Sequence, residues 1–117
     1  MGEMGLAAVF SALFLTVVPS GAFGTVVIDP ARPVCIAGQP CTAPDAHDVL
    51  AFWRGTKRIA TATTGIDGGF RVALVPGLYR ITLPHRVGAR ATVSPAQIRV
   101  LRGRFVRVAI RVDVGIR

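Results

Sequence analysis

The chain has 117 residues, a net charge of +8 and only six acidic residues, and this length holds one domain. So few carboxylates exclude a calcium site rich in acidic side chains, and no motif of a phosphate-binding loop or a zinc hydrolase is present. Thirteen of the 14 basic residues are Arg, which favours anionic neighbours such as cell-wall polymers, lipid head groups or nucleic acid, or else reflects genome composition alone.

The N-terminal segment contains a continuous apolar run at residues 6–18, LAAVFSALFLTVV. Thirteen residues suit the core of a signal peptide and are short for a membrane span, which needs about 20. Two small-residue cleavage patterns follow, SGA before Phe23 and AFG before Thr25. We therefore predict a signal peptide at residues 1–24 and a mature domain at 25–117. Because Glu3 precedes the run without any Lys or Arg, an uncleaved anchor and a buried first strand remain alternatives.

The next segment combines a predicted first strand, residues 24–29, with a long loop, residues 30–47, that carries both cysteines. Cys35 and Cys41 are separated by five residues that include turn formers, which favours a local disulfide in an exported protein. So short a loop stabilises the fold by only about 2 kcal/mol. Free thiols, or a metal site with His47 or His85, are the alternatives, although the two-residue spacing of a zinc knuckle is missing.

The middle of the chain predicts two further strands. Residues 49–54, VLAFWR, are apolar on both faces, which is typical of an interior strand. Residues 57–64 alternate small side chains around Ile59 and also suit a strand. Trp53 lies in the apolar run and is assigned to the core, while its position beside Arg54 would also suit stacking on a sugar or base.

Two chain reversals flank an alternating strand at residues 64–79. Asp67-Gly68 predicts a tight turn, because Asp bonds nearby amides and Gly accepts a positive φ. A two-residue hairpin at Pro76-Gly77 would place large apolar residues on one face by pairing Leu74 with Tyr79, Val72 with Ile81 and Phe70 with Leu83. Since trans Pro-Gly favours a type II turn, the alternative is a corner that opens out.

The C-terminal part predicts a second loop, residues 84–95, and then two strands joined by a turn at Gly103. The alternation turns one set of side chains inward, namely Ile98, Val100, Val106, Val108, Ile110 and Val112. Phe105, Arg107 and Arg111 face outward. No segment after residue 24 has a helical period. The prediction is an all-β fold, a seven-stranded antiparallel β-sandwich.

The motifs Thr64-x-x-Asp67-Gly68-x-Phe70 and Leu74-x-Pro76-Gly77-x-Tyr79 resemble those of the carboxypeptidase regulatory-like domain. That family shares the transthyretin-like, or prealbumin-like, sandwich with repeats of bacterial collagen adhesins, and the resemblance covers residues 24–114. It implies a small exported bacterial module without catalytic activity. The adhesins' Lys–Asn crosslink is not expected, because the chain has one lysine, Lys57, and no Asn.

A small hydrolase of the transthyretin-related kind is the alternative function. Those enzymes use histidines and a C-terminal Tyr-Arg-Gly-Ser segment, whereas this chain ends Val-Gly-Ile-Arg. His47 lies near Asp45 and Asp48, which could form an acid–base pair, but no nucleophile accompanies it at a recognisable spacing. His85 lies in a loop among cations. We therefore expect no catalytic residue, no metal site and no cofactor.

The expected function is a binding or structural role of a secreted or periplasmic protein at the cell envelope. Four outward arginines are the candidate contacts to anionic ligands: Arg71, Arg80, Arg107 and Arg111. The expected partners are anionic envelope polymers, or an envelope protein that receives an added edge strand. No specific nucleic acid is expected, nor a stable membrane span once the leader is cleaved.

Overall fold

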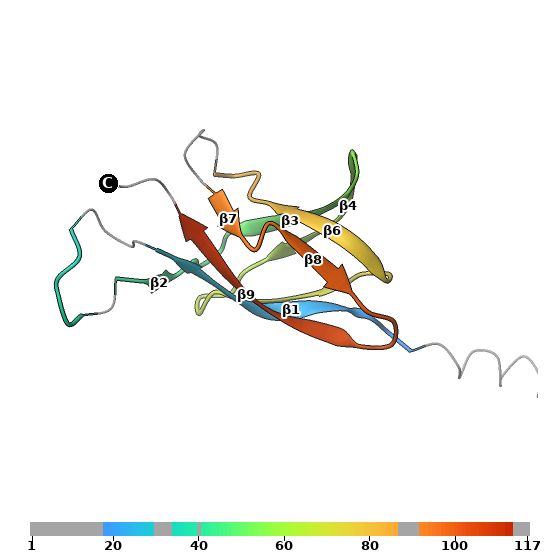
Figure 1. Ribbon diagram of the computed structural model, residues 1–117, viewed down its shortest axis with the longest axis horizontal. Helices are drawn as coiled ribbons and strands as arrows, with labels where there is room; N and C mark the ends of the chain where they lie inside the picture. Colours follow the sequence, from blue (N-terminus) through green and yellow to red (C-terminus); the bar gives the residue numbers. More distant parts are fainter. Residues whose placement is uncertain (1–17, 30–33, 40, 87–91, 114–117) are drawn as a thin grey trace, which may run out of the picture.

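The computed structural model describes residues 18–29, 34–39, 41–86 and 92–113, which form two β-sheets packed face to face (Figure 1). Sheet A contains β1 (Gly21–Ile28), β2 (Ala43–Pro44), β5 (Gly69–Ala73), β7 (Thr92–Ser94) and β9 (Phe105–Asp113). Sheet B contains β3 (Val49–Arg54), β4 (Lys57–Thr63), β6 (Gly77–Thr82) and β8 (Gln97–Val100). The predicted all-β sandwich is confirmed. In the described ranges no helix is long and apolar enough to cross a membrane.

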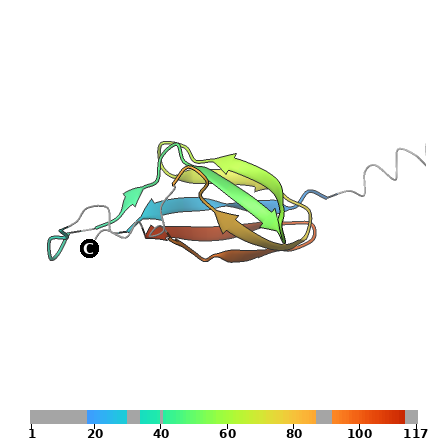
Figure 2. The ribbon, with the colours of Figure 1, turned by 90° about the horizontal axis from the view of Figure 1, so that it is seen from above.

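Strand β1 lies inside sheet A, between β9 on one side and β5 with β2 on the other. The pairing of β1 with β9 is parallel over its whole length, so the prediction of a purely antiparallel sandwich was wrong. Both strands begin at the same end of the molecule, which Figure 2 shows from above. The chain returns to that end through sheet B, and its last strand then follows the direction of the first.

The described residues form nine strands where seven were predicted. The two additional strands, β2 and β7, lie within the segments predicted as loops and have two and three residues. They form because β1 and β9 offer free backbone groups at the sheet edges. β2 has two residues, and the alternation of Thr92, Val93 and Ser94 in β7 is too short to predict a strand within a loop.

Sheet B has the order β4-β3-β6-β8, which confirms that the apolar segment at 49–54 is an interior strand. The two sheets meet through their apolar faces, and the rings of Phe52 from sheet B and Phe70 from sheet A lie 6.3 Å apart. Tyr79 is fully buried between the sheets. Val108, Ile110 and Val112 point inward as predicted, while Val106 is only partly buried against this core.

The predicted hairpin at Pro76-Gly77 was wrong, because β5 and β6 lie in different sheets. The chain opens out here as a corner. Leu74 exchanges hydrogen bonds with Ser20, its N–H donating to the Ser20 carbonyl at 3.0 Å and its own carbonyl accepting from the hydroxyl at 2.6 Å. The Tyr79 hydroxyl donates to the Val75 carbonyl at 2.6 Å and holds the corner from the core. The six apolar residues that the hairpin would have turned inward are still all buried, because half of them belong to the β5 side of the corner and half to the β6 side.

The turn at Asp67-Gly68 is confirmed. The Asp67 carboxylate accepts the Gly69 N–H at 2.9 Å, and Gly68 has a φ of 80°, which favours glycine. A Cβ atom at Gly68 would overlap the carbonyl of Val26, so space excludes a side chain there as well. The Val26 N–H donates to the Gly68 carbonyl, so the turn between β4 and β5 is hydrogen-bonded to β1.

The first strand begins at Gly21, three residues before its predicted start. The Gly21 N–H donates to the Arg104 carbonyl at 3.1 Å, and Ala22 is completely buried in the core. The strand begins this early because β5 and β9 both offer pairing partners to its first residues. Cleavage before Phe23 or Thr25 would remove buried residues from β1. Removal of a leader stays a prediction.

Candidate anion-binding surface

The outer face of sheet A gathers cationic and aromatic side chains from three adjacent strands. Register places Arg71 of β5, Phe23 of β1 and Arg107 of β9 side by side across the sheet, so these three side chains share a face. By the period of two along β9, Phe105 and Arg111 lie on the same face. We call these five residues the Arg/Phe face.

Arg71 lies on the aromatic ring of Phe105, with its guanidinium carbon 3.8 Å from the ring centroid. This stacking uses the π-face of Phe105 and leaves the edge of the guanidinium plane, with its N–H donors, free to meet a ligand. Arg71 is exposed and Phe105 is half-buried, so the contact orients the guanidinium without burying its charge. The arrangement suits capture of a planar or tetrahedral anion.

Arg111 lies toward the far end of the same face and forms an ion pair with Asp29, with Nε 3.4 Å from the carboxylate oxygen. Both side chains are partly exposed, so this pair contributes little to stability. Among the described residues Arg71 and Arg107 form no ion pair. The positive charge of the Arg/Phe face is therefore least neutralised around Phe23.

Arg80, the fourth predicted contact, lies on sheet B and not on the Arg/Phe face. Its guanidinium carbon is 5.4 Å from the centroid of the Trp53 ring, and the two residues are direct partners across β3 and β6. Trp53 is half-buried, and its indole N–H donates to the Thr82 hydroxyl at 2.8 Å. The structure thus brings three of the four predicted arginines together and places the fourth on the other layer.

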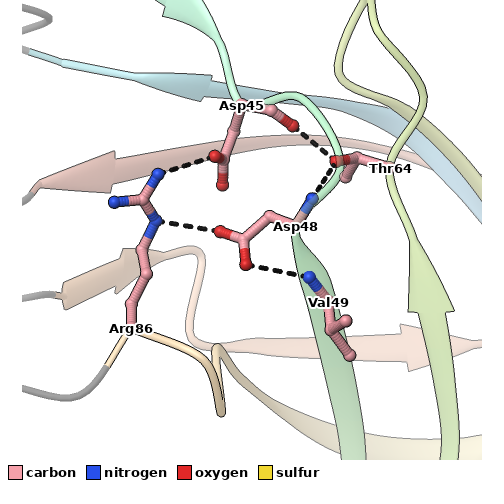
Figure 3. A network of polar contacts seen from close by, with 5 residues as sticks. All are labelled: Asp45, Asp48, Val49, Thr64 and Arg86. Atoms are coloured by element: carbon pink, nitrogen blue, oxygen red, sulfur yellow. Dashed lines mark hydrogen bonds and ion pairs between the residues drawn. The ribbon is translucent and has the colours of Figure 1, made fainter.

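A polar network of mostly buried side chains lies near the end of β1, where β2 pairs with it. Figure 3 shows its contacts. Arg86 donates from Nε to Asp48 at 2.8 Å and from a terminal nitrogen to Asp45 at 2.7 Å. The Thr64 hydroxyl accepts the Asp48 N–H at 2.8 Å and donates to the Asp45 carbonyl at 2.5 Å. These bonds join the segment before β3, the end of β4 and the segment after β6.

The two carboxyl groups of this network differ in proton affinity. Burial raises the pKa of Asp45 to about 6, and the neighbouring carboxyl of Asp48 adds to the rise against the opposing effect of Arg86. Burial would also raise the pKa of Asp48, but the neighbouring Asp45 and the hydrogen bonds from Arg86 and the Val49 N–H together lower it. One oxygen of Asp45 is buried without a partner within the described structure, which fits a carboxyl group that holds its proton readily.

The network gives no support to an acid–base pair around His47. Asp45 and Asp48 turn inward to Arg86, whereas His47 is exposed and has a φ of 56°. His85 is exposed as well. Arg86 lies in the segment predicted as a loop, residues 84–95, and its role was not predicted. The only signal was a pair of aspartates just before an interior strand, since a buried carboxylate needs a cationic or hydrogen-bonding partner.

The remaining predicted chemistry concerns the cysteines. Cys35 and Cys41 form the predicted disulfide, with their Cα atoms 5.5 Å apart, in a loop beyond β1 (Figure 1). Cys35 is exposed and Cys41 is half-buried, so the bond closes a surface loop and does not join the two sheets. A search of the described residues finds no group of three or more His, Cys, Asp or Glu able to hold a metal ion.

No protein-family model matches the chain, and no curated protein matches its sequence. The fold is similar to that of a minor pilin of the Gram-positive pathogen Streptococcus agalactiae, with a TM-score of 0.52 and 13% identity over 83% of this chain. A DUF3823-family protein of Parabacteroides merdae has a TM-score of 0.46 and 18% identity over 81% of this chain. The chain spans 45% of the pilin and 46% of the second protein. The pilin shares the fold with this chain, and the carboxypeptidase regulatory-like label stays a prediction.

Proposed function

We propose that this protein is a non-catalytic β-sandwich module, exported by its apolar N-terminal run, that binds anionic polymers of a bacterial cell envelope through the Arg/Phe face. The observation that carries the proposal is the alignment of Arg71, Phe23 and Arg107 across three neighbouring strands. The fold shared with a bacterial minor pilin is consistent with a surface role and contributes no more than that.

The chemistry of the face favours a repeating anion over a single small ligand. The three arginines lie along an extended sheet surface, where a polymer can contact them in succession, while their donors suit phosphate, sulfate or carboxylate groups. Phe23, between Arg71 and Arg107, offers apolar surface on which a sugar ring or polymer backbone can rest. Exposed contacts of this kind are weak singly, so binding depends on several contacts at once.

The test is retention of the full chain on immobilised polyphosphate in a salt gradient. Replacing Arg71 and Arg107 with Gln removes two charges from the Arg/Phe face and retains much of each side-chain stem. The matched control replaces Arg58 and Arg99, two exposed arginines of sheet B, and has the same net charge.

We expect the Arg71→Gln, Arg107→Gln variant to elute at lower salt, with affinity reduced by up to about fivefold per arginine. The control should remain close to the parent protein. Equal losses in the two variants would mean that binding follows net charge alone. Retention that does not respond to salt, or no retention, would remove the proposed contact.

A further inference from the structure

The end of the sandwich where β1 begins carries an apolar surface that the proposed function does not use. We call it the N-proximal end and define it as residues 18–20, 75–78 and 101–104. Four large apolar residues are exposed here, with exposed fractions of 61% for Val18, 58% for Val75, 49% for Leu78 and 42% for Leu101. Val18, Val75 and Gly103 help to line an open groove of about 720 Å³.

The N-proximal end carries cationic side chains and, among the described residues, no acidic ones. Arg102 and Arg104 lie in the β8–β9 turn, and the guanidinium of Arg54 lies beside Gly77 and over the ring of Tyr79. The five described acidic residues all lie outside this end, namely Asp29, Asp45, Asp48, Asp67 and Asp113. Exposed apolar side chains with a cationic border are typical of surfaces that bind anionic membranes.

The apolar sequence that precedes the N-proximal end indicates which partner binds there. The apolar run at residues 6–18 reaches the described part of the chain at Val18, which lines the groove. We infer that the N-proximal end binds the surface of an anionic lipid membrane, with its apolar residues in the head-group region and its arginines on the lipid phosphates. This inference rests on the proposed export to the envelope, but it uses a surface separate from the Arg/Phe face.

The length of the apolar run fits this arrangement. The run has 13 residues, whereas a helix needs about 20 to cross a bilayer. A retained run would therefore hold the domain directly against the membrane surface. A short apolar segment is accommodated when flanking residues enter the interface. Val75 is exposed and lines the groove together with Val18, where the run joins the sandwich, and Leu101 is exposed in the β8–β9 turn at the same end. Both side chains can enter the interface there. The disulfide loop would then point away from the membrane, because it lies at the other end of β1 (Figure 1).

The experiment must show which residues of the domain contact the membrane, because residues 6–18 alone can bind the full chain to vesicles. Hydrogen exchange of the full chain is measured with vesicles of phosphatidylglycerol and phosphatidylcholine, and with phosphatidylcholine alone. We expect anionic vesicles to slow exchange at residues 75–78 and 101–104 by at least about tenfold, with no change at residues 65–69. Replacing Arg102 and Arg104 with Gln should weaken binding to anionic vesicles by about 30-fold, since each cation near such a surface contributes about fivefold.

A pair of double variants tests the apolar part of the surface. Val75→Glu with Leu101→Glu should abolish the slowed exchange, whereas Ile36→Glu with Ile66→Glu, which changes exposed residues at the other end, should retain it. Slowed exchange centred on Phe23 and Arg107 would overturn the inference and leave the Arg/Phe face as the contact. Slowing that follows protein concentration without vesicles would also overturn it, in favour of a second copy. Polyphosphate retention without any protection at this end would refute the inference while leaving the proposed function intact.

Discussion

Thr64 connects two segments of the polar network through one buried hydroxyl, which accepts the Asp48 N–H and donates to the Asp45 carbonyl. Thr64→Val retains the shape of the side chain and leaves both backbone groups without this partner. We expect a loss of about 2 kcal/mol in the free energy of unfolding, measured by urea denaturation. The control is Thr63→Val, the exposed last residue of β4, which should change stability by less than about 0.5 kcal/mol.

Asp45 should make the stability of the protein depend on pH near neutrality. Its folded pKa of about 6 lies above the ordinary value of 3.8, so its stabilisation is complete below about pH 4 and is lost as the pH rises through 6. Asp48 acts in the opposite sense, because its lowered pKa contributes stability that is lost only as the pH falls below its ordinary value. The free energy of unfolding should therefore fall by about 1 kcal/mol between pH 5 and pH 7.

The variant that isolates this effect is Asp45→Asn, which can still accept the hydrogen bond from Arg86. The fall between pH 5 and pH 7 should disappear in the variant, while contributions of other groups remain in both proteins. Urea denaturation across that range measures the difference. A fall of equal size in the two proteins would show that the carboxyl of Asp45 does not hold the proton.

At the scale of residues, local chemistry was predictable and long-range pairing was not. The Asp67-Gly68 turn followed from two neighbouring side chains, and the disulfide from a spacing of six residues along the chain. Arg86 binds carboxylates that lie 41 and 38 positions earlier in the sequence. Its neighbours in the chain carry no sign of that contact, because it exists only once β3 and β6 are paired.

At the scale of elements, the early start of β1 has a direct consequence for processing. A chain that begins at Thr25 lacks Ala22, which is fully buried, and the pairing of residues 21 and 22 with β5 and β9. We expect it to be less stable than a chain that begins at Val18 by about 3 kcal/mol, from lost burial and lost hydrogen bonds. Thermal unfolding of the two chains measures this. Equal stability would mean that the first residues of β1 are dispensable and that cleavage before Thr25 costs the fold nothing.

The β5–β6 connection shows why strand patterns predicted burial better than pairing. Alternation fixed which side chains face inward, and Val72 and Ile81 are buried as expected. The same alternation fits a hairpin and a corner equally well, because both turn those side chains toward one core. The choice depends on Ser20 and the start of β1, which take the backbone hydrogen bonds of Leu74. That segment was assigned to the leader, so its contribution could not enter the prediction.

At the scale of the whole molecule, strand order decides which arginines act together. Alternation predicted that Arg71, Arg80, Arg107 and Arg111 point outward, and all four are exposed. It could not predict that β5, β1 and β9 are neighbours while β6 lies in the other sheet, because this order joins segments far apart in the sequence. The Arg/Phe face and the N-proximal end both arise from that order. These two cationic surfaces are separate, one on sheet A and one at the end of the molecule, and on sheet B register places Arg58 and Arg80 on either side of Trp53.

Binding of an anionic polymer to the outer face of sheet A can be mapped residue by residue. Amide NMR spectra of the isotope-labelled protein, recorded during titration with polyphosphate, report which strands the polymer contacts. We expect the largest shifts around Phe23, Arg71 and Arg107, with small shifts around Trp53 and Arg80. Shifts centred on β3 and β6, or spread evenly over every exposed arginine, would contradict it.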